Sequence, residues 1–180
     1  MKKILLILFL IPALLAQNGC KKRDKKLFTI PINMSFNTPY ATIEITDIDS
    51  QIALETYRFP TGIDAYLIPK NSAKELIEDV FLDKMDMTIV MNDSTTFDIL
   101  KKIDVYLKAD GLKETLGAYM HDVPQQQLST ISLTPSGNNL KEYLKKDEIY
   151  LVIKMVLRAP LPKGTLMTIK TKYKGTAGVL

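Results

Sequence analysis

The stretch "EIYLVIKMVLRAPLPKGTLMTIKTKY", residues 148–173, contains two runs in which apolar and polar side chains alternate. Alternation with a period of two is typical of half-buried antiparallel strands. The residues predicted to face the core are Ile149, Leu151, Ile153, Met155 and Leu157 in the first run, and Met167, Ile169, Thr171 and Tyr173 in the second. Residues 160–164 between the runs have the composition of a turn, so we predict a hairpin with a longer loop.

The same alternation recurs along the chain outside this stretch. Further core positions are predicted at Phe28, Ile30, Ile32 and Met34, at Ala41, Ile43 and Ile45, at Phe81, Met85, Met87 and Ile89, and at Ile103, Val105, Leu107 and Ala109. Weaker strand patterns cover 52–59, 63–68, 115–120 and 129–134. Because Pro31 has no N–H to donate, we expect the first strand to be an edge strand or to carry a bulge.

Helical patterns are short. Residues 138–147 and 71–80 each predict a short helix, the second with Ser72 as its cap, and 95–102 predicts one further turn. None is long enough to connect parallel strands. Many strands with few helices indicate two packed sheets, and we predict a mainly β protein with an antiparallel immunoglobulin-like β-sandwich. By length, residues 27–180 form a single domain.

The first 19 residues have the pattern of a secretory signal. Lys2 and Lys3 precede an apolar run from Ile4 to Ala16, which as a helix is about 20 Å long and is short for a membrane span. A basic segment followed by an apolar one predicts a signal-peptide helix that is removed. The alternative is an N-terminal core helix, which the lack of a polar face disfavours.

Gly19-Cys20 follows this run and resembles the cleavage and acylation site of bacterial lipoproteins. Gln17 and Asn18 depart from the residues usual at that site. The resemblance implies cleavage after Gly19, acylation of the Cys20 thiol, and a lipid-anchored protein of the cell envelope, at the outer membrane. A free or buried thiol is the alternative for Cys20, the single cysteine of the chain. Residues 20–26 then form an acylated basic tether.

The basic charge of the chain is concentrated near its start. The formal net charge is +4 overall, but from residue 27 onward 19 acidic residues outnumber 17 basic ones. Residues 21–26 contain five basic residues, which suit an anionic membrane surface or a solvated spacer equally well. This distribution argues against nucleic acid as a partner.

Candidate catalytic groups are scattered. His121 is the single histidine and is predicted on a surface loop, and acidic residues that stand near strands or turns are Asp47, Asp49, Asp79, Asp83 and Asp86. No pattern of a metal site, a serine triad or a phosphate-binding loop is present. We therefore expect a non-enzymatic protein with no catalytic residues, no metal and no cofactor.

Two further resemblances bear on origin and modification. Residues 97–116 and 139–175 contain stretches that resemble an exported lipoprotein domain of Bacteroidota-type bacteria, and the similarity covers roughly residues 71–173; such domains generally lack an assigned function. Asp93-Ser94-Thr95 resembles the O-glycosylation acceptor of such proteins and makes Ser94 a candidate site, the alternative being a capped turn.

Three functions follow as hypotheses. The first is a structural or adaptor module with an envelope protein as partner. The second is an accessory module that binds a glycan or a peptide through exposed tyrosines such as Tyr57 and Tyr66, or through loops 60–63, 121–127 and 135–139. The third is a hydrolase that uses converging carboxylates.

Overall fold

The computed structural model describes residues 27–39, 41–91 and 94–180. The predicted signal peptide, the cleavage site at Gly19 and the acylated Cys20 lie outside the described residues. None of the helices in the described ranges has the length and the apolar character that crossing a bilayer requires.

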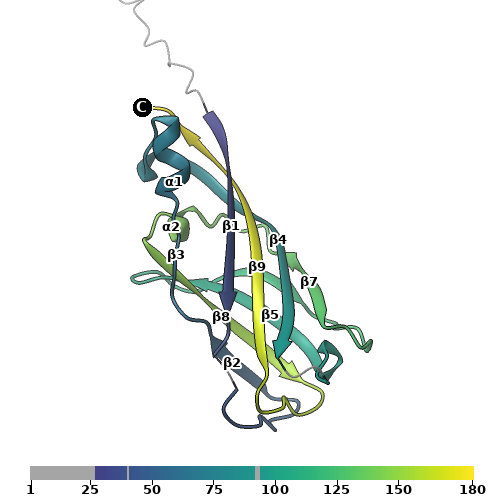
Figure 1. Ribbon diagram of the computed structural model, residues 1–180. Coiled ribbons are helices and arrows are strands. Elements are labelled where there is room, and N and C mark those ends of the chain that lie inside the picture. The colour runs from purple at the N-terminus through teal and green to yellow at the C-terminus, as the bar shows by residue number, and fades with distance from the viewer. Residues whose placement is uncertain (1–26, 40, 92–93) are drawn as a thin grey trace, which may run out of the picture.

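The described chain is mainly antiparallel β structure (Figure 1). The strands are β1 (Leu27–Asn37), β2 (Gln51–Glu55), β3 (Phe59–Pro60), β4 (Ile77–Met91), β5 (Leu100–Lys108), β6 (Thr115–Met120), β7 (Thr130–Pro135), β8 (Glu148–Leu157) and β9 (Leu166–Gly178). The helices are α1 (Asp64–Leu67) and α2 (Lys141–Leu144), with 3₁₀ turns η2 (Ile68–Lys70), η3 (Lys74–Leu76) and η4 (Phe97–Ile99).

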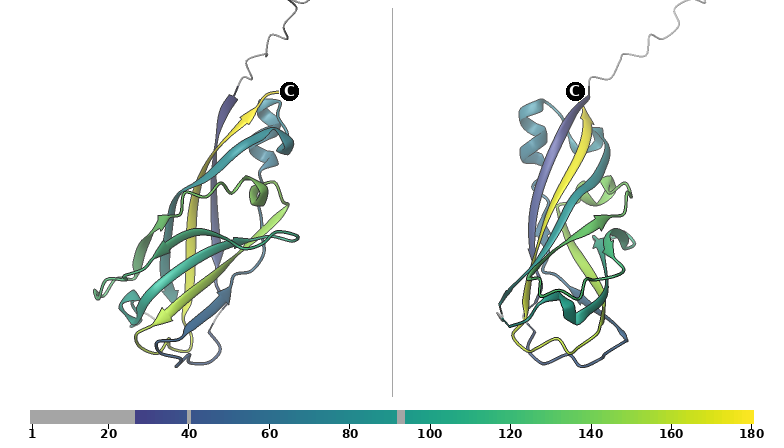
Figure 2. Two further views of the ribbon diagram at one scale, coloured as in Figure 1. Left: turned by 180° about the vertical axis from the view of Figure 1, so that it is seen from behind. Right: turned by 90° about the vertical axis from the view of Figure 1, so that its right-hand side faces the viewer.

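Hydrogen bonds join the strands in the order β1-β9-β4-β7-β6-β5-β8-β2, with β3 paired to β8. Strands β1, β9 and β4 run side by side, and β5, β8 and β2 cross behind them at an angle (Figures 1 and 2). Strand β7 links the two halves, because residues 130–133 pair with β4 and residues 134–135 pair with β6. The result is one curled sheet, and the immunoglobulin-like division into two sheets is not confirmed.

The predicted hairpin between residues 148–157 and 166–173 is wrong. Strand β8 pairs with β5 and β2, whereas β9 pairs with β1 and β4, so consecutive strands belong to opposite halves of the curled sheet. The loop between them is held by Leu161, whose backbone N–H donates to the carbonyl of Ile45 at 2.9 Å. The loop crosses between the halves because the two strands that it joins lie in opposite halves. Its own hydrogen bonds are made with other loops and not with a neighbouring strand.

The core lies between the two halves and contains the predicted inward positions of β1, β5, β8 and β9. In each of these strands every second side chain is buried, and Tyr173 and Phe36 are the largest of the fully buried ones. Burial of an Ile or Leu side chain contributes about 1.5–3 kcal/mol. Pro31 lies on β1 at the edge of the sheet, as expected for a residue that lacks an N–H.

Strand β4 departs from the predicted alternation. Its register against β9 shifts between Leu82 and Lys84, which leaves Asp83 as an extra residue. The buried positions are therefore Val80 and Leu82 before the shift and Met85 and Met87 after it. Phe81, predicted in the core, is 41% exposed. An extra residue exchanges the two faces of a strand, which a uniform period of two does not predict.

Three other local predictions are corrected. Residues 41–46 form a loop with one isolated bridge instead of a strand, because they connect β1 to β2 across the end of the sheet. Residues 63–68 contain α1 instead of a strand, and the buried Ile63 and Leu67 have helical i, i+4 spacing. Residues 71–80 form η3 and the start of β4, because pairing with β9 overrides helix propensity.

The remaining weaker predictions fit. Strands β6 and β7 and helix α2 lie where the patterns placed them, and 52–59 divides into β2 and β3. Ser72 does not cap a helix, since its hydroxyl donates to the carbonyl of Gly178 at 2.6 Å. Leu27 pairs with Gly178, so the start of β1 and the end of β9 lie at the same end of the domain, beside α1 (Figure 1).

Candidate functional site

The outward side of the half formed by β2, β8, β5 and β6 carries tyrosine and charged side chains. We call this surface the tyrosine face; its residues are Glu55, Tyr57, Arg58, Lys102, Asp104, Tyr106, Lys108, Asp110, Glu114, Tyr119, His121, Tyr150 and Lys154. On β5 and β8, Lys108 lies opposite Tyr150, and Asp104 lies opposite Lys154. These are the polar positions of the two alternating runs, so the alternation that fills the core also builds this face.

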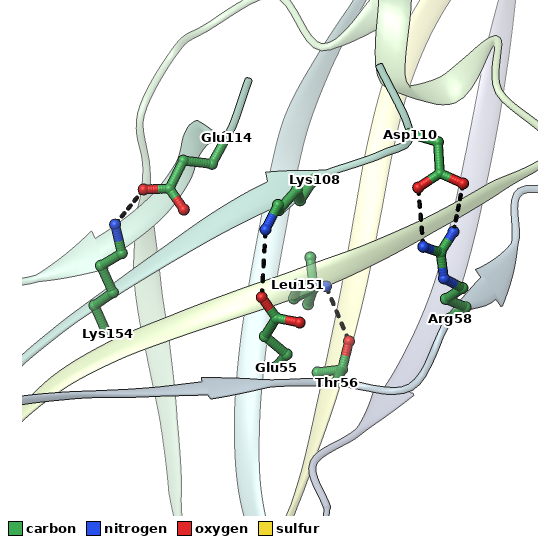
Figure 3. A network of polar contacts seen from close by, with 8 residues as sticks. All are labelled: Glu55, Thr56, Arg58, Lys108, Asp110, Glu114, Leu151 and Lys154. Carbon is green, nitrogen blue, oxygen red and sulfur yellow. Dashed lines mark hydrogen bonds and ion pairs between the residues drawn. The ribbon is translucent and has the colours of Figure 1, made fainter. Parts of the chain in front are cut away.

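Two cations lie near the ring of Tyr150. The guanidinium carbon of Arg58 is 5.1 Å from the centre of the Tyr150 ring, and Nζ of Lys108 is 5.5 Å from it. Both distances fall in the range of cation–π contacts. Arg58 also donates two hydrogen bonds of 2.9 Å to Asp110, and this pair lowers the pKa of the Asp110 carboxyl. Lys108 reaches Glu55 at 3.4 Å (Figure 3).

Tyr106 is covered by a third cation. Nζ of Lys154 lies 4.3 Å from the centre of the Tyr106 ring and forms an ion pair with Glu114 (Figure 3). The hydrogen bond to Glu114 raises the pKa of Lys154. Val152 on β8 lies opposite Glu55 of β2 on one side and opposite Tyr106 of β5 on the other, and although it is at an outward position it is buried. The long side chains of the tyrosine face therefore cover this apolar residue and shield it from water.

His121 belongs to the margin of the tyrosine face. Its Nε2 lies 3.0 Å from Oδ1 of Asp104, and its ring lies 4.6 Å from the Tyr119 ring. Asp104 is buried and also pairs with Lys102 at 2.8 Å, which raises the pKa of that lysine. The prediction of an exposed loop histidine is correct, but no sequence pattern indicated its pairing with Asp104, 17 residues away.

The two tyrosines proposed as ligand contacts have different surroundings. Tyr57 is 66% exposed and stands beside Arg58 at the margin of the tyrosine face. Its position is fixed by the preceding Thr56, whose hydroxyl accepts a hydrogen bond of 2.9 Å from the backbone N–H of Leu151 (Figure 3). Tyr66 is partly buried on α1 and packs against the core, so it is a poor contact residue.

The candidate carboxylates do not converge. Asp49 pairs with Lys101, and Asp79 accepts hydrogen bonds from the backbone and hydroxyl of Thr176. On β4, Asp83 pairs with Lys174 and Lys172, and Asp86 with Lys84 and Ser132. Within residues 27–39, 41–91 and 94–180, no group of three or more His, Cys, Asp or Glu side chains is arranged to hold a metal ion.

Ser94 is exposed in a turn after β4. Its neighbour Asp93, which completes the acceptor pattern, lies outside the described residues. Exposure on a turn is compatible with modification, and O-glycosylation of Ser94 stays a prediction.

A hollow of about 450 Å³ adjoins the tyrosine face. It is lined by Arg58, Asp110, Lys146, Asp147 and Glu148. The pKa of Asp147 is lowered by its hydrogen bond to Lys74, at 2.7 Å. Charged groups of both signs line this hollow, so polar ligands of mixed charge fit it better than apolar ones.

Comparisons with known proteins identify no family. No protein-family model and no curated protein sequence matches the chain. Solved structures with some likeness include a chain of Desmodium yellow mottle tymovirus, with 12% identity and a TM-score of 0.27 over 86% of this chain and 90% of that one. A chain of the empty head of turnip yellow mosaic virus has 13% identity and a TM-score of 0.31, over 86% and 84%. TM-scores this low assign neither fold nor function.

Proposed function

We propose that the chain is an envelope lipoprotein of a Bacteroidota-type bacterium, anchored through acylated Cys20 at the outer membrane. In this proposal residues 27–180 act as a non-enzymatic adaptor that binds another envelope protein. The two halves of the curled sheet serve as the layers of an immunoglobulin-like sandwich. The leader and Gly19-Cys20 support the anchor, and the tyrosine face supports the adaptor role.

The main support for the adaptor role is the composition of the tyrosine face. Tyrosine and arginine are enriched at protein interfaces, because they combine a large contact area with polar groups that stay satisfied. Arg58 is already oriented by Asp110, and Tyr57 beside it is exposed. A partner that covers Tyr57 and Tyr150 gains apolar contact without ordering new long side chains, which lowers the entropic cost of binding.

The anchor is tested by replacing Cys20. The Cys20→Ser protein should leave the membrane fraction, and the wild-type chain should carry an acyl mass on its N-terminal peptide. Recovery of lipid-free wild type together with membrane-bound Cys20→Ser protein would show that the anchoring proposal is wrong.

The adaptor role is tested by site-specific photo-crosslinking in cells that make the full chain. A photoreactive residue at position 57 should give a discrete protein adduct, and Arg58→Ala should reduce it. A photoreactive residue at Ile43, which is 70% exposed in the loop between β1 and β2 and is not part of the tyrosine face, is the matched control. Equal adducts from both positions would contradict a specific partner surface.

Glycan or peptide binding is the second candidate function. The exposed Tyr57 ring beside the Arg58–Asp110 pair offers stacking and hydrogen bonding together, as sugar and peptide ligands require. Saturable binding to a glycan array that Tyr57→Ala abolishes, and that Tyr66→Phe leaves unchanged, would favour this function over the adaptor role.

A further inference from the structure

The end of the domain where β1 begins carries exposed apolar side chains. Ile68 on η2 is 71% exposed, and Leu27, Val179 and Leu180 are exposed as well. We call these four residues the anchor-end patch. Single exposed apolar residues are ordinary on protein surfaces, but a group of them indicates an interaction site.

Hydrogen bonds hold the residues of the anchor-end patch near one another. Leu27 pairs with Gly178, the residue before Val179. The backbone N–H of Leu180 donates to the carbonyl of Asn71 at 2.9 Å, and the N–H of Asn71 donates to the carbonyl of Ile68 at 3.0 Å. Figures 1 and 2 show the start of β1, the end of β9 and the helical segment together in every view.

Basic residues accompany the anchor-end patch in the sequence. The five basic residues of segment 21–26 directly precede Leu27, and the exposed Lys70 stands two residues after Ile68. Exposed apolar side chains next to lysine and arginine are the combination that binds the interface of a bilayer containing anionic lipids. The basic charge next to the anchor-end patch therefore favours an anionic lipid surface as its binding partner.

We propose that the anchor-end patch docks on an anionic lipid surface, with Ile68 inserted among the headgroups. This inference rests on the proposed lipid anchor and adds a fixed orientation to it. The domain then stands on the membrane by the end that contains α1, η2 and Leu27. The loop that carries Ile43, at the opposite end of the sheet, points away from the bilayer (Figure 1).

Tryptophan fluorescence tests this orientation, because the chain contains no tryptophan. The full acylated chain is prepared as Ile68→Trp and, as the matched control, Ile43→Trp. These two sites are 71% and 70% exposed, so neither change disturbs the core. Each protein is reconstituted into phosphatidylcholine–phosphatidylglycerol vesicles with and without brominated acyl chains.

In these vesicles the tryptophan of Ile68→Trp should be quenched by the brominated lipid and its emission shifted to the blue, whereas that of Ile43→Trp should be unchanged. Addition of Lys70→Glu to Ile68→Trp, or replacement of phosphatidylglycerol by phosphatidylcholine, should reduce the quenching. The far-ultraviolet circular dichroism of each variant should match that of the wild-type chain.

The possible outcomes separate docking from anchoring. If the proteins float with the vesicles but neither tryptophan is quenched, the docking proposal is wrong and the anchor stays intact. Equal quenching at positions 68 and 43 would lead to the same conclusion. If Cys20→Ser in the Ile68→Trp background still floats and is quenched, docking is supported and the Cys20 anchor is not. A wild-type chain that does not float counts against both.

Discussion

Two buried tyrosines of this domain should respond oppositely to the loss of their hydroxyl groups. Tyr173 on β9 is fully buried, and among the described residues its hydroxyl has no hydrogen-bond partner of normal geometry; the Thr171 side chain nearby offsets only part of the effect of burial on its pKa. Tyr143 on α2 is also buried, but its hydroxyl lies 2.6 Å from that of Thr115 and donates to the carbonyl of Lys113. Both can be replaced by phenylalanine, which keeps the ring and removes only the oxygen.

The magnitudes follow from these surroundings. A buried polar group without a partner costs about 1–3 kcal/mol, so Tyr173→Phe should raise the free energy of unfolding by about 1 kcal/mol at neutral pH. Tyr143→Phe should lower it by about 1–2 kcal/mol, because Lys113 and Thr115 lose their partner. For a domain of this length, 1 kcal/mol corresponds to about 2–4 °C in the unfolding temperature.

A pH series adds a second readout for Tyr173. Burial raises the pKa of its hydroxyl from 10.0 to about 12. Above pH 10 the unfolded chain therefore releases this proton first, and stability falls as the pH rises toward 12. The loss attributable to Tyr173 amounts to about 2–3 kcal/mol, since each pKa unit corresponds to 1.36 kcal/mol. The stability advantage of Tyr173→Phe should therefore grow across this range.

Urea unfolding followed by circular dichroism measures all three proteins at neutral pH and in the alkaline range. Lysine deprotonation affects them alike, so the difference between variant and wild type isolates Tyr173. A Tyr173→Phe protein that is less stable than wild type at neutral pH, or whose advantage does not grow above pH 10, would refute the argument.

Two further pairs of variants test the packing of β9 and the register of β4. A Cβ at Gly175 would lie 2.8 Å from the carbonyl oxygen of Asp79, so Gly175→Ala should cost about 1–3 kcal/mol in urea unfolding. Gly178→Ala, where a Cβ meets ordinary contacts, should cost nothing; equal losses would contradict the clash. The exposed Phe81 should tolerate Phe81→Thr at a cost below about 1 kcal/mol, whereas Leu82→Ala should cost about 2–4 kcal/mol by thermal unfolding. A larger loss of stability for Phe81→Thr than for Leu82→Ala would show that the register shift does not lie between Leu82 and Lys84.

Local pattern was enough to predict most strands and the inward side of most of them. The alternation in β1, β5, β8 and β9 was correct because one face of each strand meets the core and the other meets water. It failed at Phe81, because the extra residue Asp83, at one of the register shifts of β4, exchanges the two faces and leaves the composition of the run unchanged.

The sequence by itself determined that residues 27–180 are mainly β structure with short helices, that Pro31 needs an edge position or a bulge, and that the excess of basic over acidic residues lies before Leu27. Those properties depend on each residue and its near neighbours. Tertiary structure decided that β8 and β9 separate into opposite halves, and that Tyr150 and Tyr106 meet their cations on one face. The reason is that strand pairing joins residues far apart in sequence, and its free energy depends on the whole sheet.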